Sequence, residues 1–118
     1  MGERLKAYEA ALRRANPLRD SGLSVFDRFS ELYPVAYEDG ALPTKTLELV
    51  ALAVSVVRDC EDCITYHMIR LHELGASGEE ILQLFALILV VGGSTVIPTL
   101  RRSLWFLEEL EEDRASQT

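Results

Sequence analysis

The segment that decides the fold reads Asp59-Cys-Glu-Asp-Cys-Ile-Thr-Tyr-His-Met-Ile-Arg-Leu-His-Glu-Leu-Gly75. Its ends carry the signals of a helix, because Asp59 suits an N-cap and Gly75 suits the position after the last turn. At about 3.6 residues per turn, Cys60, Cys63 and His67 fall within roughly 60° of one another. The segment therefore predicts a helix over residues 60–74 that carries two thiols and an imidazole on one face.

The rest of the chain also reads as helices, because no segment shows the alternation of a half-buried strand. Pro17 ends the first expected helix, and Pro34 should end or kink the second. Ser77-Gly-Glu-Glu80 is a capping box for the fifth. The expected helices cover residues 3–15, 21–37, 44–58, 60–74, 81–91 and 94 to about 112. We expect an all-α bundle of about six helices, formed as one domain by residues 1–118.

Charge and composition limit the partners. The chain has 118 residues, a net charge of −7 and an isoelectric point near 4.8. Nucleic-acid binding usually needs a basic face, and anionic membrane surfaces attract basic segments, so neither partner is expected. The first residues are not followed by an apolar core of signal-peptide length, which favours a cytoplasmic protein.

Residues 81–100 carry no charge, so a membrane span has to be weighed. Gly92-Gly93, Pro98 and Gln83 interrupt this run, and the capping box opens it, so burial against other helices is the preferred interpretation. Residues 44–58 and 81–91 are apolar nearly all round. Four short neighbours cannot enclose both, which predicts a homo-oligomer with an interface near Val50 and Leu87. The alternative is a tight monomer with one central helix.

The two thiols and His67 suit redox chemistry. A thiolate is the nucleophile in peroxide reduction and disulfide exchange, and a helix N-terminus beside Cys60 lowers a thiol pKa. His67 can accept a proton from Cys63, the nearer thiol, which would leave Cys60 as the more solvent-facing partner. The spacing also allows Cys60 and Cys63 to close into a disulfide within one chain. Glu61 and Asp62 oppose thiol ionisation.

Other interpretations of the same residues remain open. Cys60, Cys63 and His67 share a seam with Leu71 and Leu74, where cysteine can be a small buried hydrophobe. Two thiols and an imidazole are also zinc ligands, although three ligands within two turns of one helix do not readily surround an ion. Attachment of haem is disfavoured because no histidine follows the second cysteine directly.

Glu48 is the one charge in an otherwise apolar helical stretch. A carboxylate there should be paired, hydrogen-bonded or protonated, so it could relay protons to the dithiol. Alternatively, Glu48 and Ser55 mark a narrow solvated stripe. His72 points about 140° away from His67 on the helix and is expected at the surface.

The motifs resemble the carboxymuconolactone decarboxylase superfamily, and more closely its AhpD-like alkylhydroperoxidase branch, over roughly residues 20–110. The matching motifs are Leu42-Pro-x-Lys45-x-x-Glu48, Cys60-x-x-Cys63-x-x-x-His67, Leu74-Gly-Ala76 and Glu79-Glu-Ile81. The resemblance implies an all-α fold, assembly into trimers or hexamers, and a catalytic proton relay of Glu48, Cys60, Cys63 and His67. The dithiol chemistry expected of these residues requires no organic cofactor and no metal. The acidic spacer Glu61-Asp62 departs from the pattern of many relatives.

The sequence thus favours a dithiol alkylhydroperoxidase or disulfide reductase that acts on peroxides. By family analogy, a lipoyl or thioredoxin-like dithiol carrier would reduce the Cys60–Cys63 disulfide. One alternative is a non-enzymatic redox-sensing or scaffold oligomer. Another is a proton-transfer enzyme of the carboxymuconolactone decarboxylase kind, although decarboxylase members of the family generally lack the cysteine pair.

Overall fold

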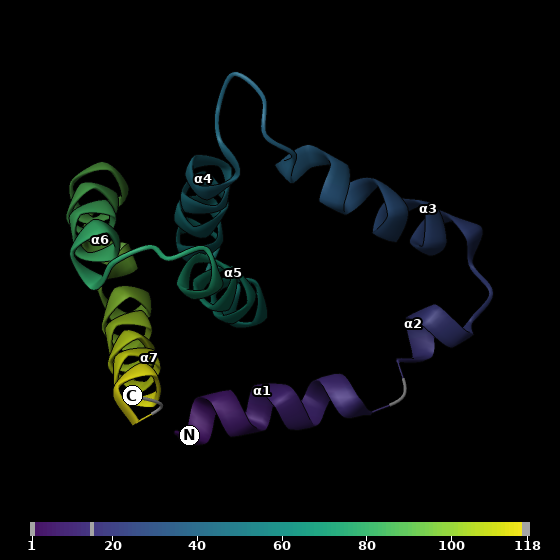
Figure 1. The fold of residues 1–118 in the computed structure, drawn as a ribbon, viewed down its shortest axis with the longest axis horizontal. Coiled ribbons are helices and arrows are strands. Elements are labelled where there is room, and N and C mark those ends of the chain that lie inside the picture. Colours follow the sequence, from purple (N-terminus) through teal and green to yellow (C-terminus); the bar gives the residue numbers. More distant parts are fainter. Residues whose placement is uncertain (1, 15, 117–118) are drawn as a thin grey trace.

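The computed structural model describes residues 2–14 and 16–116, which form helices joined by short turns (Figure 1). Six helices have nine residues or more, and α2 is a single turn, so the predicted all-α class is confirmed. The elements are α1 (Glu3–Arg13), α2 (Pro17–Asp20), α3 (Ser24–Leu32), η1 (Tyr33–Tyr37), α4 (Thr44–Val57), α5 (Glu61–Glu73), α6 (Gly78–Gly92), η2 (Ser94–Val96) and α7 (Ile97–Ser116).

The core lies among α4, α5, α6 and α7, with α5 at its centre. Ile64, Met68 and Leu71 of α5 are fully buried, and they follow one another at helical spacing. From α4 and α7 they meet Leu52 and Phe106, which are also fully buried. The helix that carries the dithiol is therefore held rigidly by the best-packed part of the molecule.

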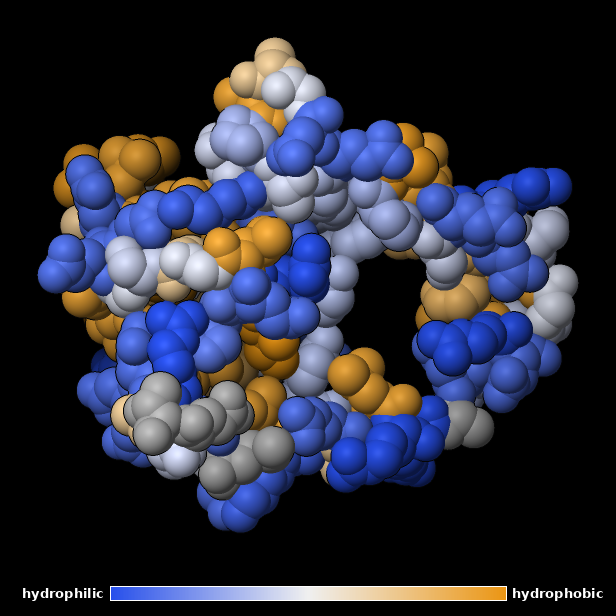
Figure 2. All heavy atoms as spheres, in the orientation of Figure 1, coloured by the Kyte–Doolittle hydropathy of each residue, from blue (hydrophilic) through white to orange (hydrophobic). Residues whose placement is uncertain are grey.

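The first three helices form an arm that runs around one side of the molecule. Leu5 anchors α1 against the core, whereas α2 and α3 contain no buried residue. Figure 1 shows the arm passing from α1 through α2 to α3 before η1 returns the chain to α4. Figure 2 shows an opening through the molecule between this arm and the helices of the core. The arm places η1 beside α5 while leaving much of its own apolar surface exposed.

Local signals account for most helix ends. The capping box is present, since Ser77 accepts from the backbone of Glu80 and Glu80 accepts from the backbone of Ser77. Gly75 has φ +81°, a left-handed conformation that glycine adopts without a steric cost. α3 ends at Leu32, two residues before Pro34, and the 3₁₀ turn η1 follows from Tyr33, so the helix expected over residues 21–37 is divided.

Two expected helix starts are wrong. Asp59 is not the N-cap of α5: it has φ +54°, and Cys60 caps the helix instead. The carboxylate of Asp59 is occupied elsewhere, because it accepts hydrogen bonds from Thr99 and Arg102 of α7. Ser94 does not cap the last helix but begins η2, and α7 extends to Ser116. The first helix is expected to end at residue 15, which lies outside the described residues.

A groove between α4 and α6 is lined almost wholly by apolar side chains. Its exposed members include Val54 (51% exposed), Leu87 (60%) and Val91 (77%). Val50 of α4 is exposed as well. We call the exposed apolar surface of these four residues the α4–α6 face. In the part of the chain that the structure describes, no helix is long and apolar enough to cross a membrane.

Candidate dithiol site

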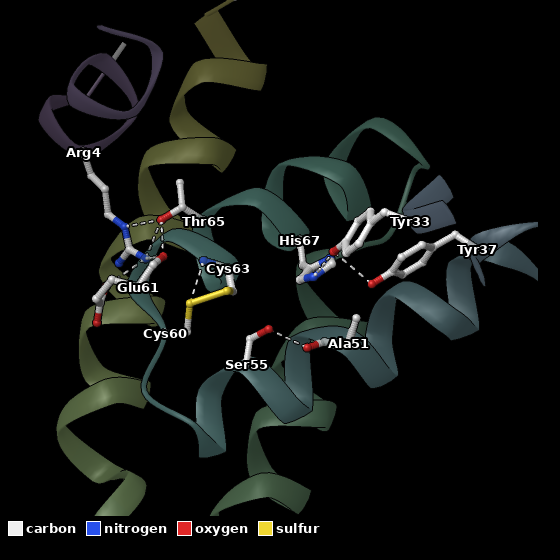
Figure 3. Close-up of a disulfide and its surroundings, with 10 residues drawn as sticks. All are labelled: Arg4, Tyr33, Tyr37, Ala51, Ser55, Cys60, Glu61, Cys63, Thr65 and His67. Carbon is white, nitrogen blue, oxygen red and sulfur yellow. Dashed lines mark hydrogen bonds and ion pairs between the residues drawn. A yellow bond between two sulfur atoms is a disulfide. The ribbon is translucent and has the colours of Figure 1, made fainter. Parts of the chain in front are cut away.

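Cys60 and Cys63 form a disulfide at the start of α5, with their Cα atoms 5.3 Å apart (Figure 3). Cys60 is the N-cap residue, and its sulfur accepts a hydrogen bond from the backbone N–H of Cys63 at 3.3 Å. This amide would stabilise a thiolate at Cys60. Cys63 is exposed and Cys60 is only half-buried, so the expectation that Cys60 faces solvent more than Cys63 is wrong. The reason is that the cap position turns Cys60 back toward the helix.

Glu48 and His67 form a buried pair between α4 and α5. Nδ1 of His67 lies 2.6 Å from Oε2 of Glu48, and the residues are 4% and 2% exposed. The second carboxylate oxygen of Glu48 lies 3.9 Å from Nε of Arg70. Glu48 is thus paired, as a buried carboxylate must be. The alternative of a solvated stripe fails, because Ser55 is also buried and donates to the carbonyl of Ala51 (Figure 3).

A chain of hydrogen bonds runs from His67 to two tyrosines that were not expected in the site from the sequence. The hydroxyl of Tyr33 lies 3.1 Å from Nε2 of His67, and the hydroxyl of Tyr37 donates to that of Tyr33 at 3.0 Å. Figure 3 shows the hydroxyl of Tyr33 directed toward the imidazole and the hydroxyl of Tyr37 directed toward that of Tyr33. In the sequence, Tyr33 lies in the segment 21–37 that is expected to be helical, and no motif marks it as a site residue. The four-residue step from Tyr33 to Tyr37 across Pro34 is the one local hint of a shared role.

An open groove of about 570 Å³ connects the exposed thiol to the imidazole. Cys63 and His67 both line it, together with Tyr33. The arm covers it from one side, and the remaining lining residues are Arg19, Phe26, Phe29, Ser30, Pro34, Asp62 and Tyr66. A small molecule in this groove would therefore meet Cys63 before it meets Cys60.

The acidic residues around Cys60 are offset by two arginines. Arg102 of α7 donates to Glu61 at 2.8 Å and to Asp59 at 3.1 Å. Arg4 of α1 lies 3.1 Å from the other oxygen of Glu61 and also donates to the hydroxyl of Thr65. The expectation that Glu61 simply opposes thiol ionisation therefore needs correction, because its charge is shared between two guanidinium groups. Asp62 remains exposed in the first turn of α5.

The remaining titratable candidates lie apart from the dithiol. His72, which is expected at the surface, is half-buried, and Nη2 of Arg114 lies 3.0 Å from its Nδ1. Within residues 2–14 and 16–116, no cluster of three or more His, Cys, Asp and Glu side chains could hold a metal ion.

Comparison with known proteins places the site in a family context. The model of the carboxymuconolactone decarboxylase family matches residues 24–104. An uncharacterised protein of the cox locus of Paracoccus denitrificans is 38% identical over 53% of this chain, and the match spans only 57% of that protein. An uncharacterised protein of Cupriavidus necator is 29% identical over 70% of this chain and 68% of its own length.

Solved structures show the same architecture. A carboxymuconolactone decarboxylase family protein from Thermotoga maritima, with a candidate role in an antioxidative response, is 47% identical over 80% of this chain and 98% of its own, at a TM-score of 0.76. A second structure from that organism is 44% identical over 94% and 98%, at a TM-score of 0.86. A family member from Legionella pneumophila is 34% identical over 91% and 90%, at a TM-score of 0.70.

Proposed function

The chain belongs to the carboxymuconolactone decarboxylase family, and from that premise we propose that it is a dithiol alkylhydroperoxidase or disulfide reductase of the AhpD-like kind. One observation carries the proposal: Cys63 of the Cys60–Cys63 disulfide lines the same groove as His67, whose imidazole is paired with the buried Glu48. A dithiol that can close, beside a histidine held by a carboxylate, has the groups that thiol-based peroxide reduction requires.

The proposed cycle begins with Cys63, the exposed thiol. Its thiolate attacks one peroxide oxygen, so that a sulfur–oxygen bond forms, the oxygen–oxygen bond breaks, and the leaving alkoxide takes a proton. Cys60 then attacks the resulting sulfenic acid, which forms the disulfide and releases water. The peroxide has been reduced by two electrons, and the two thiols have been oxidised. The amide hydrogen bond to the sulfur of Cys60 favours its thiolate in the second step.

Glu48 and His67 supply the proton transfers in this cycle. The carboxylate of Glu48 favours a proton on Nδ1 of His67, which leaves Nε2 as the basic atom that faces the groove. His67 takes the thiol proton through this atom and returns it to the leaving oxygen. No organic cofactor or metal takes part in the proposed steps.

The cycle needs a reductant and, we propose, an assembly. An external dithiol, of lipoyl or thioredoxin-like chemistry, attacks the exposed sulfur of Cys63 and restores both thiols by disulfide exchange. A compartment that supplies such reductants is the cytoplasm. A homo-oligomer, a trimer or a hexamer by family analogy, would cover the α4–α6 face.

The test is a peroxide-consumption assay with the purified chain, several dithiol donors, and Cys60→Ser and Cys63→Ser as matched controls. Rapid turnover that depends on a dithiol donor and is lost in both variants is the expected result. Slow, stoichiometric oxidation with a change in molecular mass would instead identify a redox-sensing oligomer. Activity toward a lactone acid that survives in the cysteine variants would identify a decarboxylase-like proton transfer.

A further inference from the structure

The hydroxyl of Tyr33 is within hydrogen-bond distance of the nitrogen of His67 that the proposed chemistry needs. Nδ1 of His67 is engaged by Glu48, so only Nε2 is available to exchange protons with the groove. The hydroxyl of Tyr33 lies 3.1 Å from Nε2. A proton that moves between Cys63 and His67 must therefore displace Tyr33 or pass through its hydroxyl.

The direction of the hydrogen bonds favours passage of the proton through the hydroxyl of Tyr33. The hydroxyl of Tyr37 donates to the oxygen of Tyr33, which leaves the proton of Tyr33 free to point at Nε2. Burial, assisted by the hydrogen bond with Tyr37, raises the pKa of Tyr33 above its usual value near 10. The phenol thus stays protonated, and it can accept one proton only as it gives up another.

The surroundings hold the ring of Tyr33 in place. Its centroid lies 5.0 Å from that of Tyr37, 6.2 Å from that of Tyr66 and 6.4 Å from that of His67. Tyr33 is the first residue of η1, directly after α3, so it reaches His67 from outside the core helices. Tyr33 also lines the groove in which Cys63 is exposed.

We propose that Tyr33 carries the proton between Nε2 of His67 and the groove, while Glu48 sets the tautomer of His67. In the forward step, the S–H bond of Cys63 breaks, its proton reaches the oxygen of Tyr33, and the phenol's own proton moves to Nε2. The products are a thiolate and an imidazolium paired with Glu48. In the return step, the imidazolium proton passes back through Tyr33 to the oxygen released from the peroxide.

The return step rests on the proposed function, but the forward step can be measured without any peroxide. The protein is reduced, and the reaction of Cys63 with iodoacetamide is followed against pH in a Cys60→Ser background. Tyr33→Phe removes the hydroxyl and keeps the ring. Tyr8→Phe makes the same chemical change on α1, at a ring outside the groove lining. Circular dichroism and thermal melting of each variant monitor the fold.

The expected result is about a tenfold slower alkylation of Cys63 at neutral pH in Tyr33→Phe, with the pH profile moved toward that of a free thiol near 8.5. Tyr8→Phe should match the parent. In a His67→Phe background, Tyr33→Phe should add little further loss, because it acts through His67. An unchanged pH profile in Tyr33→Phe, or an equal slowing of alkylation in Tyr33→Phe and Tyr8→Phe, overturns the proposal. So does a Tyr33→Phe loss that adds in full to the loss caused by His67→Phe.

Peroxide turnover separates this proposal from the wider function. If Tyr33→Phe shifts the thiol titration but the parent consumes no peroxide with any dithiol, the role of Tyr33 stands and the peroxidase function fails. If peroxide is consumed equally by the parent and Tyr33→Phe at every pH, the function stands and Tyr33 carries no proton.

Discussion

The carboxylate of Glu48 and the imidazole of His67 meet at 2.6 Å inside the contact between α4 and α5, where neither side chain is more than 4% exposed. They are separated by nineteen residues in the chain, so the packing of two helices sets the distance. Because water cannot solvate the carboxylate there, the hydrogen bond from Nδ1 is its main compensation. The same bond directs the second nitrogen of the imidazole toward Tyr33 and the groove.

Removing either member of this pair should slow peroxide reduction. For Glu48→Gln and His67→Phe we expect losses on the order of 10²-fold in kcat/KM, the usual scale for one general acid–base group. In His67→Phe the pH–rate profile should move toward the titration of a free thiol near 8.5. Steady-state assays across pH measure both effects. Unchanged rates and profiles, with activity lost only in the cysteine variants, would leave the dithiol chemistry in place and remove the relay.

The two reduced thiols should differ in their reaction with a bulky reagent. Cys63 is exposed and faces the groove, whereas Cys60 is half-buried at the cap position. After reduction, we expect a maleimide with a large substituent to label Cys63 about tenfold faster than Cys60, because a buried sulfur is less accessible. Peptide mapping of partly labelled protein measures the ratio. Equal labelling, or preference for Cys60, would contradict the assignment of Cys63 as the attacking thiol.

Local sequence signals predicted the end of α5 and the start of α6, because both are local structures. Gly75 and the box from Ser77 to Glu80 act through backbone atoms within a few residues, so pattern and structure agree there. The prediction of Asp59 as the N-cap was wrong because of a tertiary contact. Its carboxylate is taken by Thr99 and Arg102, some forty residues away, and the cap role passes to Cys60.

The family motifs indicated Glu48, but they could not indicate Tyr33. The contact between Glu48 and His67 crosses two neighbouring helices of the best-packed region, where a lone charge in an apolar helix is an unusual signal. Tyr33 reaches His67 only because the arm passes around the molecule and η1 returns beside α5. The helical pattern of residues 21–37 does not determine the path that the arm takes around the molecule.

His72 should make stability depend on pH in the range just below its usual pKa of 6.5. Burial, followed by the charge of Arg114, lowers the pKa of folded His72 below its usual 6.5, although Glu111, Asp113 and Glu73 act in the opposite direction. The unfolded chain therefore binds more protons in this range. The free energy of unfolding is highest above the unfolded pKa and falls as pH drops through 6.5 toward the lower folded pKa.

Urea unfolding of the parent and of His72→Gln at several pH values tests this effect. His72→Gln keeps a hydrogen-bond acceptor for Arg114 and removes the titration, so the slope of stability against pH should become flatter. Arg114→Gln should flatten it as well, because the opposing charge is gone. A steeper slope in either variant, or equal slopes in all three proteins, would show that another group controls this pH range.

The α4–α6 face should form a subunit interface. Val54, Leu87 and Val91 are each more than half exposed in a groove whose lining is apolar except for Arg58, and contiguous surfaces of this kind mark association sites. We expect the chain to be an oligomer at micromolar concentration, and Val54→Glu or Leu87→Glu to shift it to the monomer, because burying a carboxylate in an apolar contact is costly. Light scattering measures the mass.

Leu12→Glu introduces the same charge at an exposed leucine of α1, outside this face, and should leave the assembly intact. A monomeric parent, or dissociation caused equally by Leu12→Glu, would mean that the α4–α6 face is not the interface.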